Sequence, residues 1–134
     1  MNCLAVLEYA VEFLKVNHII VCGHYGCGAI NAAIEVQKKR VLDHWLRSIR
    51  DIYAGHKQEL EAIENIEKRK NRLIELNVRQ QVLNICHTPI IQKVWIDEKP
   101  LCVHGWIYDL KTGLLKDLNL CYSKISQVED IYHV

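Results

Sequence analysis

Apolar and polar positions in the first part of the chain predict a helix followed by a buried strand. Leucine and valine recur at helical spacing after Asn2, a favourable N-cap residue, which predicts a helix over about residues 3–16. Residues 18–22, His-Ile-Ile-Val-Cys, form a short apolar segment, the pattern of a strand buried on both faces of a parallel sheet. A glycine-rich loop, 23–28, follows, and residues 29–35 resume a helical pattern. This order of elements is typical of an α/β fold.

The middle of the chain, about residues 42–87, has a mostly helical pattern. Its apolar stripe is interrupted by a heavily charged stretch, 59–72, which predicts a solvent-exposed helix face. A further short helix is predicted to begin at Pro89, because proline suits the first helical turn, and to end near Trp95.

A second strand is predicted over residues 101–108, where apolar and aromatic residues predominate. Residues 109–113 form a polar turn that contains a glycine, and residues 114–120 are predicted to return as an antiparallel edge strand. No internal repeat, low-complexity segment or linker divides the sequence. We therefore interpret residues 1–134 as a single domain.

Composition and charge narrow the range of partners. Half of the 134 residues are hydrophobic, a quarter are charged, and the formal net charge is +1. This balance is ordinary for a soluble domain and does not favour nucleic acid or an anionic membrane surface as a partner. The apolar runs are too short to span a bilayer, and no secretion signal opens the sequence, so a cytoplasmic protein is expected.

The histidine and cysteine residues of the glycine-rich loop are the strongest chemical signal. His24 and Cys27 are separated by two residues directly after a predicted strand, and imidazole nitrogen and thiolate sulfur are both zinc ligands. Glycines at positions 23, 26 and 28 allow the backbone to turn tightly. Ligands of open α/β sheets lie beyond the carboxyl ends of strands, as here. Spacing alone leaves open whether the pair is a metal site or a coincidence.

A closed zinc site needs two further ligands, and a catalytic site needs one more together with water. Cys22 is predicted to point into the core, and His104 to be a core histidine within a strand. His44, His56 and His87 are predicted to be surface or capping histidines on helices. The other cysteines are expected to be mostly buried, reduced thiols or metal ligands, as is common in cytoplasmic proteins.

Residues 22–28, Cys-Gly-His-Tyr-Gly-Cys-Gly, resemble the zinc loop of the β-class carbonic anhydrases. The resemblance runs from Asn2 to about Leu120 and is closest to the bacterial branch of the family. It implies a mostly parallel sheet flanked by helices. The other segments that resemble the family, in family order, are 2–11, 45–51, 76–82, 104–108 and 113–115.

The resemblance also implies a function, the zinc-dependent reversible hydration of CO2 to bicarbonate, with one Zn²⁺ per complete site. His24 and Cys27 match zinc ligands of the family, and the backbone N–H of Gly28 matches a group near bound bicarbonate. Tyr108 matches a tyrosine that helps to form a second, inhibitory bicarbonate site in some members. Family members are dimers or tetramers, which implies a homo-oligomer.

The sequence departs from the family pattern in one respect. The family has an earlier strand with a Cys-x-Asp-x-Arg motif, which supplies the second cysteine ligand, and residues 1–134 contain no such motif. The chain is therefore expected to lack the first strands of the fold, to bind zinc weakly or not at all through its half site, and to be inactive alone. The alternatives are an inactive remnant that persists as a folded oligomer or binding module, and a zinc lyase acting on CS2 or COS.

Overall fold

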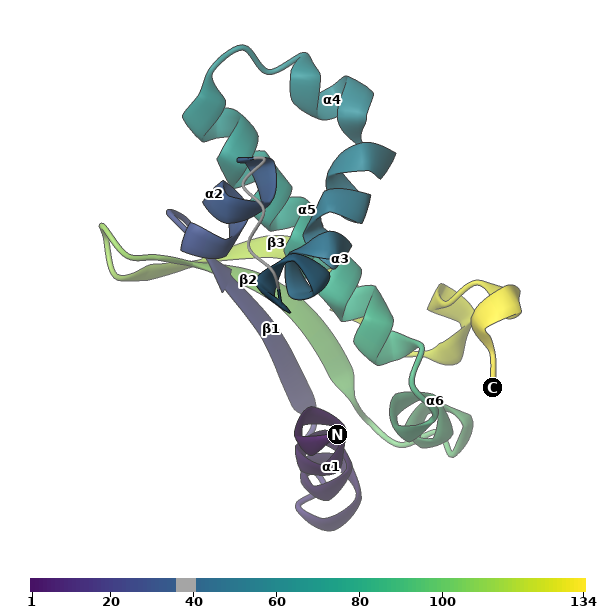
Figure 1. Ribbon diagram of the computed structural model, residues 1–134. Coiled ribbons are helices and arrows are strands. Elements are labelled where there is room, and N and C mark those ends of the chain that lie inside the picture. Colours follow the sequence, from purple (N-terminus) through teal and green to yellow (C-terminus); the bar gives the residue numbers. More distant parts are fainter. Residues whose placement is uncertain (36–40) are drawn as a thin grey trace.

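The chain begins with a helix and a strand, continues through a series of helices and returns with two strands, and the computed structural model describes residues 1–35 and 41–134 (Figure 1). These elements confirm the helices and strands predicted from the sequence, with small shifts at their ends. The strands are β1 (His18–His24), β2 (Cys102–Asp109) and β3 (Leu114–Tyr122). The helices are α1 (Asn2–Glu8), the π-helical turn η1 (Tyr9–Phe13), α2 (Gly28–Ile34), α3 (Val41–Gly55), α4 (Lys57–Glu61), α5 (Ile66–Cys86), α6 (Pro89–Ile96), and the 3-10 turns η2 (Ile125–Gln127) and η3 (Asp130–Tyr132).

The three strands form one sheet in the order β1–β2–β3. β1 and β2 are parallel, and their register pairs His18 with Cys102 at one end and His24 with Tyr108 at the other. β3 returns antiparallel to β2 after a turn in which Gly113 has a φ of 72°. A parallel pair joined through helices is the α/β arrangement that the sequence predicts.

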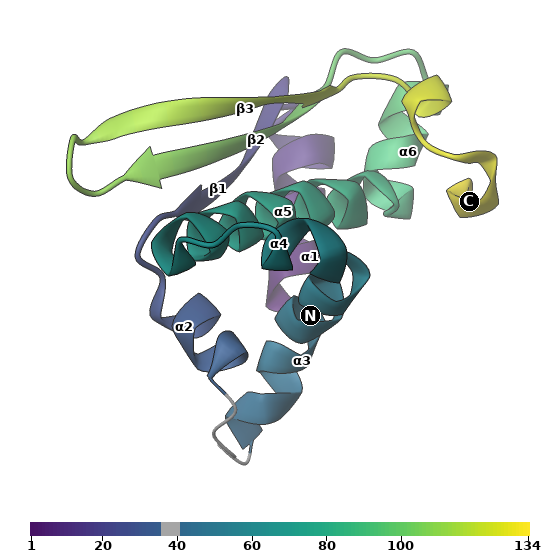
Figure 2. The ribbon, with the colours of Figure 1, turned by 90° about the horizontal axis from the view of Figure 1, so that it is seen from above.

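Helix α5 covers one face of this sheet, and α3 and α4 lie farther from it (Figure 2). Val78 and Val82 of α5 are almost completely buried where they meet β1 and β2. Burial of one such side chain contributes about 1.5–3 kcal/mol relative to leaving it exposed. The contact between α5 and the sheet is therefore the core on which the arrangement of the strands depends.

The opposite face of the sheet, which we call the open face, is covered by no helix of the described residues (Figure 2). Side chains of β1 alternate between exposed and half-buried positions, and Ile20 is 46% exposed. The prediction that residues 18–22 are buried on both faces is therefore wrong. The apolar run is misleading because β1 has only one strand neighbour and only one covered face within the described chain.

The same alternation corrects the prediction for the cysteines. Cys22 was expected in the core, but its side chain lies on the open face and is exposed. The side chains of Cys3 and Cys121 are exposed as well. Cys86, on the buried side of α5, fits the expectation, and burial raises the pKa of its thiol to about 12. All six cysteines are free thiols.

The first helix leaves most of its apolar stripe without a partner in the described chain. α1 continues as η1, and the segment ends before Lys15, whose φ of 54° is incompatible with a continuing helix. Only Val11 is buried, whereas Leu4 is 51% and Phe13 is 68% exposed. No helix of the described residues is long and apolar enough to cross a bilayer.

Two glycines of the loop region act differently from each other. Gly26 has a φ of 70° and makes the turn after β1, as predicted. Gly23 lies within β1, where a Cβ atom would stand 2.6 Å from Cγ2 of Val78 and 3.1 Å from Cδ1 of Ile107. Its role is close packing of the strand against α5, and the predicted role in turning the backbone is not needed at this position.

A polar network holds the loop after β1 to α5 and β3. The Tyr25 hydroxyl donates to Oε1 of Glu75 at 2.7 Å, and Nζ of Lys116 donates to the same oxygen at 2.8 Å. Burial alone would raise the pKa of Glu75, but hydrogen bonds from Lys116, Tyr25 and Arg72 outweigh it and lower that pKa. Glu75 therefore stays ionised and fixes Tyr25 at the end of the sheet.

We predict that Gly23→Ala destabilises the fold by about 1–3 kcal/mol, because the added methyl group overlaps Val78 and α5 must move away from the sheet. Urea unfolding followed by circular dichroism measures the change. Gly55→Ala is the matched control, since a Cβ there meets nothing within 4 Å at the end of α3. Equal stability of the two variants would show that α5 does not depend on this glycine.

We predict that Glu75→Gln lowers the free energy of unfolding at neutral pH by about 1 kcal/mol or more, because hydrogen bonds to a charged acceptor are lost. Solvent partly screens the charged partners of Glu75, which limits the size of the effect. The folded pKa of Glu75 lies below its ordinary value of 4.5. Its contribution is therefore present above that value and disappears as the pH falls through the folded pKa. The difference between parent and variant in urea unfolding should shrink on acidification, whereas Glu64→Gln, at an exposed position, should show little effect at either pH.

Candidate metal site at the end of the sheet

The four site residues predicted from the sequence lie at the carboxyl ends of β1 and β2. His24 is the last residue of β1, and Cys27 is the N-cap of α2. Gly28 is the first residue of α2. Tyr108 pairs with His24 in the parallel register. This is the edge at which open α/β sheets bind their ligands.

The hydrogen bond of His24 fixes which of its two ring nitrogens carries the proton. Its side chain is exposed, and Nδ1 lies 2.9 Å from the carbonyl oxygen of Tyr25. A carbonyl oxygen only accepts hydrogen bonds, so Nδ1 carries the proton, and the neutral ring has its lone pair on Nε2. This is the arrangement by which metal-binding histidines are usually oriented.

Cys27 and Gly28 continue the same edge at the start of α2. The Cys27 side chain is half-buried and does not cap the helix, so its sulfur is not used by the helix backbone. The N–H of Gly28 belongs to the first helical turn, in which backbone donors have no partner within the helix. A Cβ at Gly28 would meet no atom within 4 Å, so the space beside this N–H is open.

Tyr108 lies on the open face beside His24 and is 39% exposed. Its hydroxyl oxygen is 3.9 Å from the position that a Cβ on Gly113 would occupy. The phenol therefore lies near Gly113 at the tip of the β2–β3 hairpin. The tyrosine can donate a hydrogen bond at this edge of the sheet.

No third histidine, cysteine or acidic side chain joins His24 and Cys27 in a ligand cluster within residues 1–35 and 41–134. Two of the helix histidines behave as predicted: His44 is exposed on α3, and Nδ1 of His56 lies 3.0 Å from the carbonyl oxygen of Ile52. His87 stacks on Tyr132, with 4.1 Å between the ring centroids.

Two arrangements were not foreseen from the sequence. One is the network that connects Tyr25 with Glu75 and Lys116, residues far apart in the chain. The other is a cluster of His18, Cys102 and His104 at the opposite end of the sheet. The network depends on the position of α5 and the cluster on the register of β1 and β2, and no local sequence pattern indicates either one.

The fold family implied by the zinc loop carries a zinc ion, and the two residues present here suit it. The unprotonated Nε2 of His24 and the unused sulfur of Cys27 are the nitrogen and sulfur donors that zinc prefers. They supply two of the protein ligands that a zinc site needs. Their chemistry therefore fits the metal, and their number corresponds to part of its coordination shell.

Comparisons with known proteins agree with this assignment. A carbonic anhydrase of Emericella nidulans is 43% identical over 135 residues, which cover 100% of this chain and 59% of that protein. A solved structure of a tetrameric β-carbonic anhydrase from Sordaria macrospora is 37% identical with a TM-score of 0.83, covering 90% of this chain and 61% of its own. The β-carbonic anhydrase of Coccomyxa, solved with acetazolamide, is 36% identical with a TM-score of 0.86, covering 94% and 57%.

The chain thus spans about three fifths of the length of these relatives. The solved structures confirm the predicted class of fold, a sheet flanked by helices. The sequence family described as carbonic anhydrase matches residues 1–115, which is most of the chain. Taken with the β-class structures that share its fold, this match shows that the chain belongs to the β-carbonic anhydrase family.

Proposed function

We propose that this protein acts in the zinc-dependent reversible hydration of CO2 to bicarbonate. The observation that carries the proposal is the geometry of His24. Its Nδ1–H donates to the Tyr25 carbonyl oxygen, which leaves the lone pair of Nε2 available to a metal ion. Cys27 follows at the start of the next helix. The similarity to relatives that are carbonic anhydrases supports the same reaction.

In this proposal His24 Nε2 and Cys27 Sγ hold the zinc ion. The remaining protein ligands come from the Cys-x-Asp-x-Arg strand of the family, which residues 1–134 do not contain. A bound zinc ion acts as a Lewis acid and activates water at neutral pH. Three expectations stay predictions. They are that the chain is most similar to the bacterial branch, that residues 1–134 lack the first strands of the fold, and that the protein is cytoplasmic.

The residues of this chain orient the reactants. The Nδ1 hydrogen bond of His24 fixes the ring and its tautomer. The backbone N–H of Gly28 donates to an oxygen of bicarbonate, and the open space beside it admits the ligand. The phenol of Tyr25 donates to Glu75, and burial and this hydrogen bond raise its pKa, so the hydroxyl stays protonated and ties the loop between His24 and Cys27 to α5. Tyr108 offers a second donor at a peripheral bicarbonate site.

The test compares residues 1–134 alone with the same residues fused to an amino-terminal segment of a relative that carries Cys-x-Asp-x-Arg. Stopped-flow CO2 hydration should show no activity above free zinc for residues 1–134 and clear activity for the fusion. In the fusion, His24→Ala or Cys27→Ser should lower kcat/KM by more than about 100-fold, since loss even of residues that support metal ligands costs about 10–100-fold.

His44→Ala is the matched control for this experiment, because His44 is an exposed histidine on α3 and has no part in the proposed site. Activity of residues 1–134 that survives His24→Ala would contradict the assignment of the site. A fusion that binds zinc but lacks activity would favour the inactive remnant, and turnover of CS2 or COS in place of CO2 would favour the other lyase.

We also propose that the chain associates with itself, as the tetrameric relative from Sordaria macrospora does. The unpartnered face of the first helix supports this, since it includes Val6 at 69% exposure and Phe13 at 68%. Within residues 1–35 and 41–134, one edge of β1 has no strand partner, which adds unpaired backbone groups beside Ile20. Apolar surface of this kind on a monomer is usually an interface.

Light scattering should therefore report a dimer or larger species for residues 1–134. Val6→Glu with Phe13→Glu should shift the equilibrium towards monomer by at least about 10-fold, because two charges would be buried in the interface. Ile131→Glu is the control, since Ile131 is 84% exposed in the carboxy-terminal turn η3. A monomer at high concentration, or equal effects of both variants, would contradict this proposal.

A further inference from the structure

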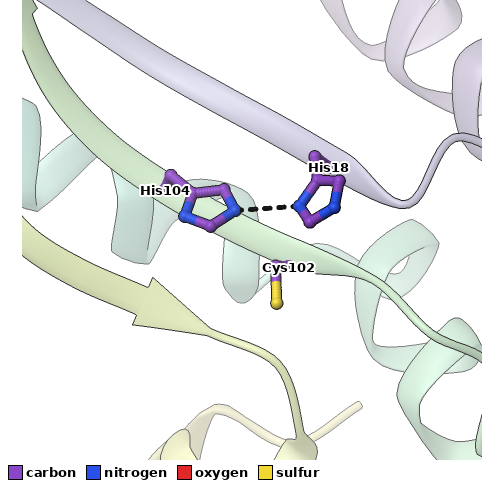
Figure 3. Close-up of side chains that lie close together, drawn as sticks. All are labelled: His18, Cys102 and His104. Carbon is purple, nitrogen blue, oxygen red and sulfur yellow. Dashed lines mark hydrogen bonds between the residues drawn. The ribbon is translucent and has the colours of Figure 1, made fainter. Parts of the chain in front are cut away.

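A second group of metal-binding side chains lies at the other end of β1. His18 is the first residue of β1, Cys102 is the first residue of β2, and His104 follows on the same strand. One ligand atom from each lies within 4.8 Å of the other two. Figure 3 shows the two imidazole rings facing each other across β1 and β2, with Cys102 beside them. His24 is six residues away along β1, or about 20 Å.

The distance between the two rings suits a shared metal ion. Nδ1 of His18 lies 3.1 Å from Nε2 of His104. Two nitrogens bound to one tetrahedral zinc ion at about 2.0–2.1 Å are separated by roughly 3.3 Å, so little movement is required. In the absence of metal one proton between the rings makes this contact a hydrogen bond.

The backbone holds these residues in position. The N–H of Cys102 donates to the carbonyl oxygen of Asn17 at 2.9 Å, immediately before His18. The indole N–H of Trp95 donates to the carbonyl oxygen of Leu101, also at 2.9 Å. Ligands on paired strands are positioned more accurately than ligands on loops.

A second sulfur, which would be the fourth ligand, lies next to the cluster. Cys121 pairs with His104 in the antiparallel register, so both side chains are on the open face. The Cys121 thiol contacts the Cys102 thiol, which places its sulfur beside the cluster. Trp106 packs near His104 on the same face, with ring centroids 5.9 Å apart. The three strands thus bring two imidazoles and two thiols together.

We propose that His18, His104 and Cys102 bind a Zn²⁺ ion that joins the beginnings of β1 and β2, with Cys121 as the fourth ligand. Two nitrogens and two sulfurs form a donor set that zinc takes in closed, structural sites. On binding, the imidazole that donates in the His18–His104 hydrogen bond would carry its proton on its other ring nitrogen, so that both facing nitrogens offer a lone pair, and the thiols of Cys102 and Cys121 would release one proton each. The site shares no residue with the one at His24 and Cys27, so it does not depend on the proposed catalytic function.

The test titrates reduced, chelator-dialysed residues 1–134 with Co²⁺, which reports its ligands spectroscopically. The visible bands of a tetrahedral ion and a thiolate-to-cobalt charge-transfer band should appear at one ion per chain, and Zn²⁺ should bleach them. His18→Ala, His104→Ala and Cys102→Ser should each weaken binding at least about 10-fold. Circular dichroism checks that each variant is folded.

The matched controls are Cys22→Ser, which removes another exposed thiol from the open face, and His24→Ala combined with Cys27→Ser. Both should keep the cobalt spectrum. Alkylation followed by mass spectrometry tests the unmutated chain as well: Zn²⁺ should protect Cys102 and Cys121 and leave Cys22 reactive. No thiolate band, no protection, or a spectrum that depends on His24 and Cys27 alone would overturn the proposal and leave His18 and His104 as a hydrogen-bonded pair.

Discussion

The close approach of α5 to one face of the sheet is the constraint on which the rest of the structure depends. Gly23 and Gly105 make it possible, because a Cβ at Gly23 would stand 2.6 Å from Val78 and a Cβ at Gly105 would stand 3.2 Å from Val82, both on α5. The helix then seals one face and fixes the relative positions of β1 and β2. It also carries Glu75, so the same helix that forms the core holds Tyr25 at the edge of the site.

A sheet covered on one face distributes its polar side chains in a simple way. Residues of β1 and β2 that face α5 are apolar or glycine, whereas every second residue faces the open side. His18, Cys22 and His24 therefore lie on the open face in one row along β1. The register of β2 sets Cys102 and His104 near the first member of that row and Tyr108 beside the last. Two sites at opposite ends follow from a single strand pairing.

The sequence is sufficient to predict features that depend on neighbours along the chain. The strand before His24, the turn at Gly26 and the helix beginning at Pro89 all follow from local patterns, and the structure confirms them. The burial of Cys22 could not be predicted correctly, because it depends on how many strands and helices surround β1. The approach of His18 to His104 likewise depends on a register between residues 86 positions apart, which no local pattern encodes.

The two ends of β1 differ in how many ligands residues 1–134 provide, and this affects how metal binding is interpreted. His24 and Cys27 are two ligands, whereas the cluster at His18 offers three and a neighbouring thiol. Because affinity for zinc rises with the number of preformed ligands, an ion offered to these residues should bind first at His18. Stoichiometric zinc in this chain would therefore not demonstrate a catalytic centre. Metal content can be related to CO2 hydration only when binding at the two ends of β1 is measured separately, with variants of His24 for one end and of Cys102 for the other.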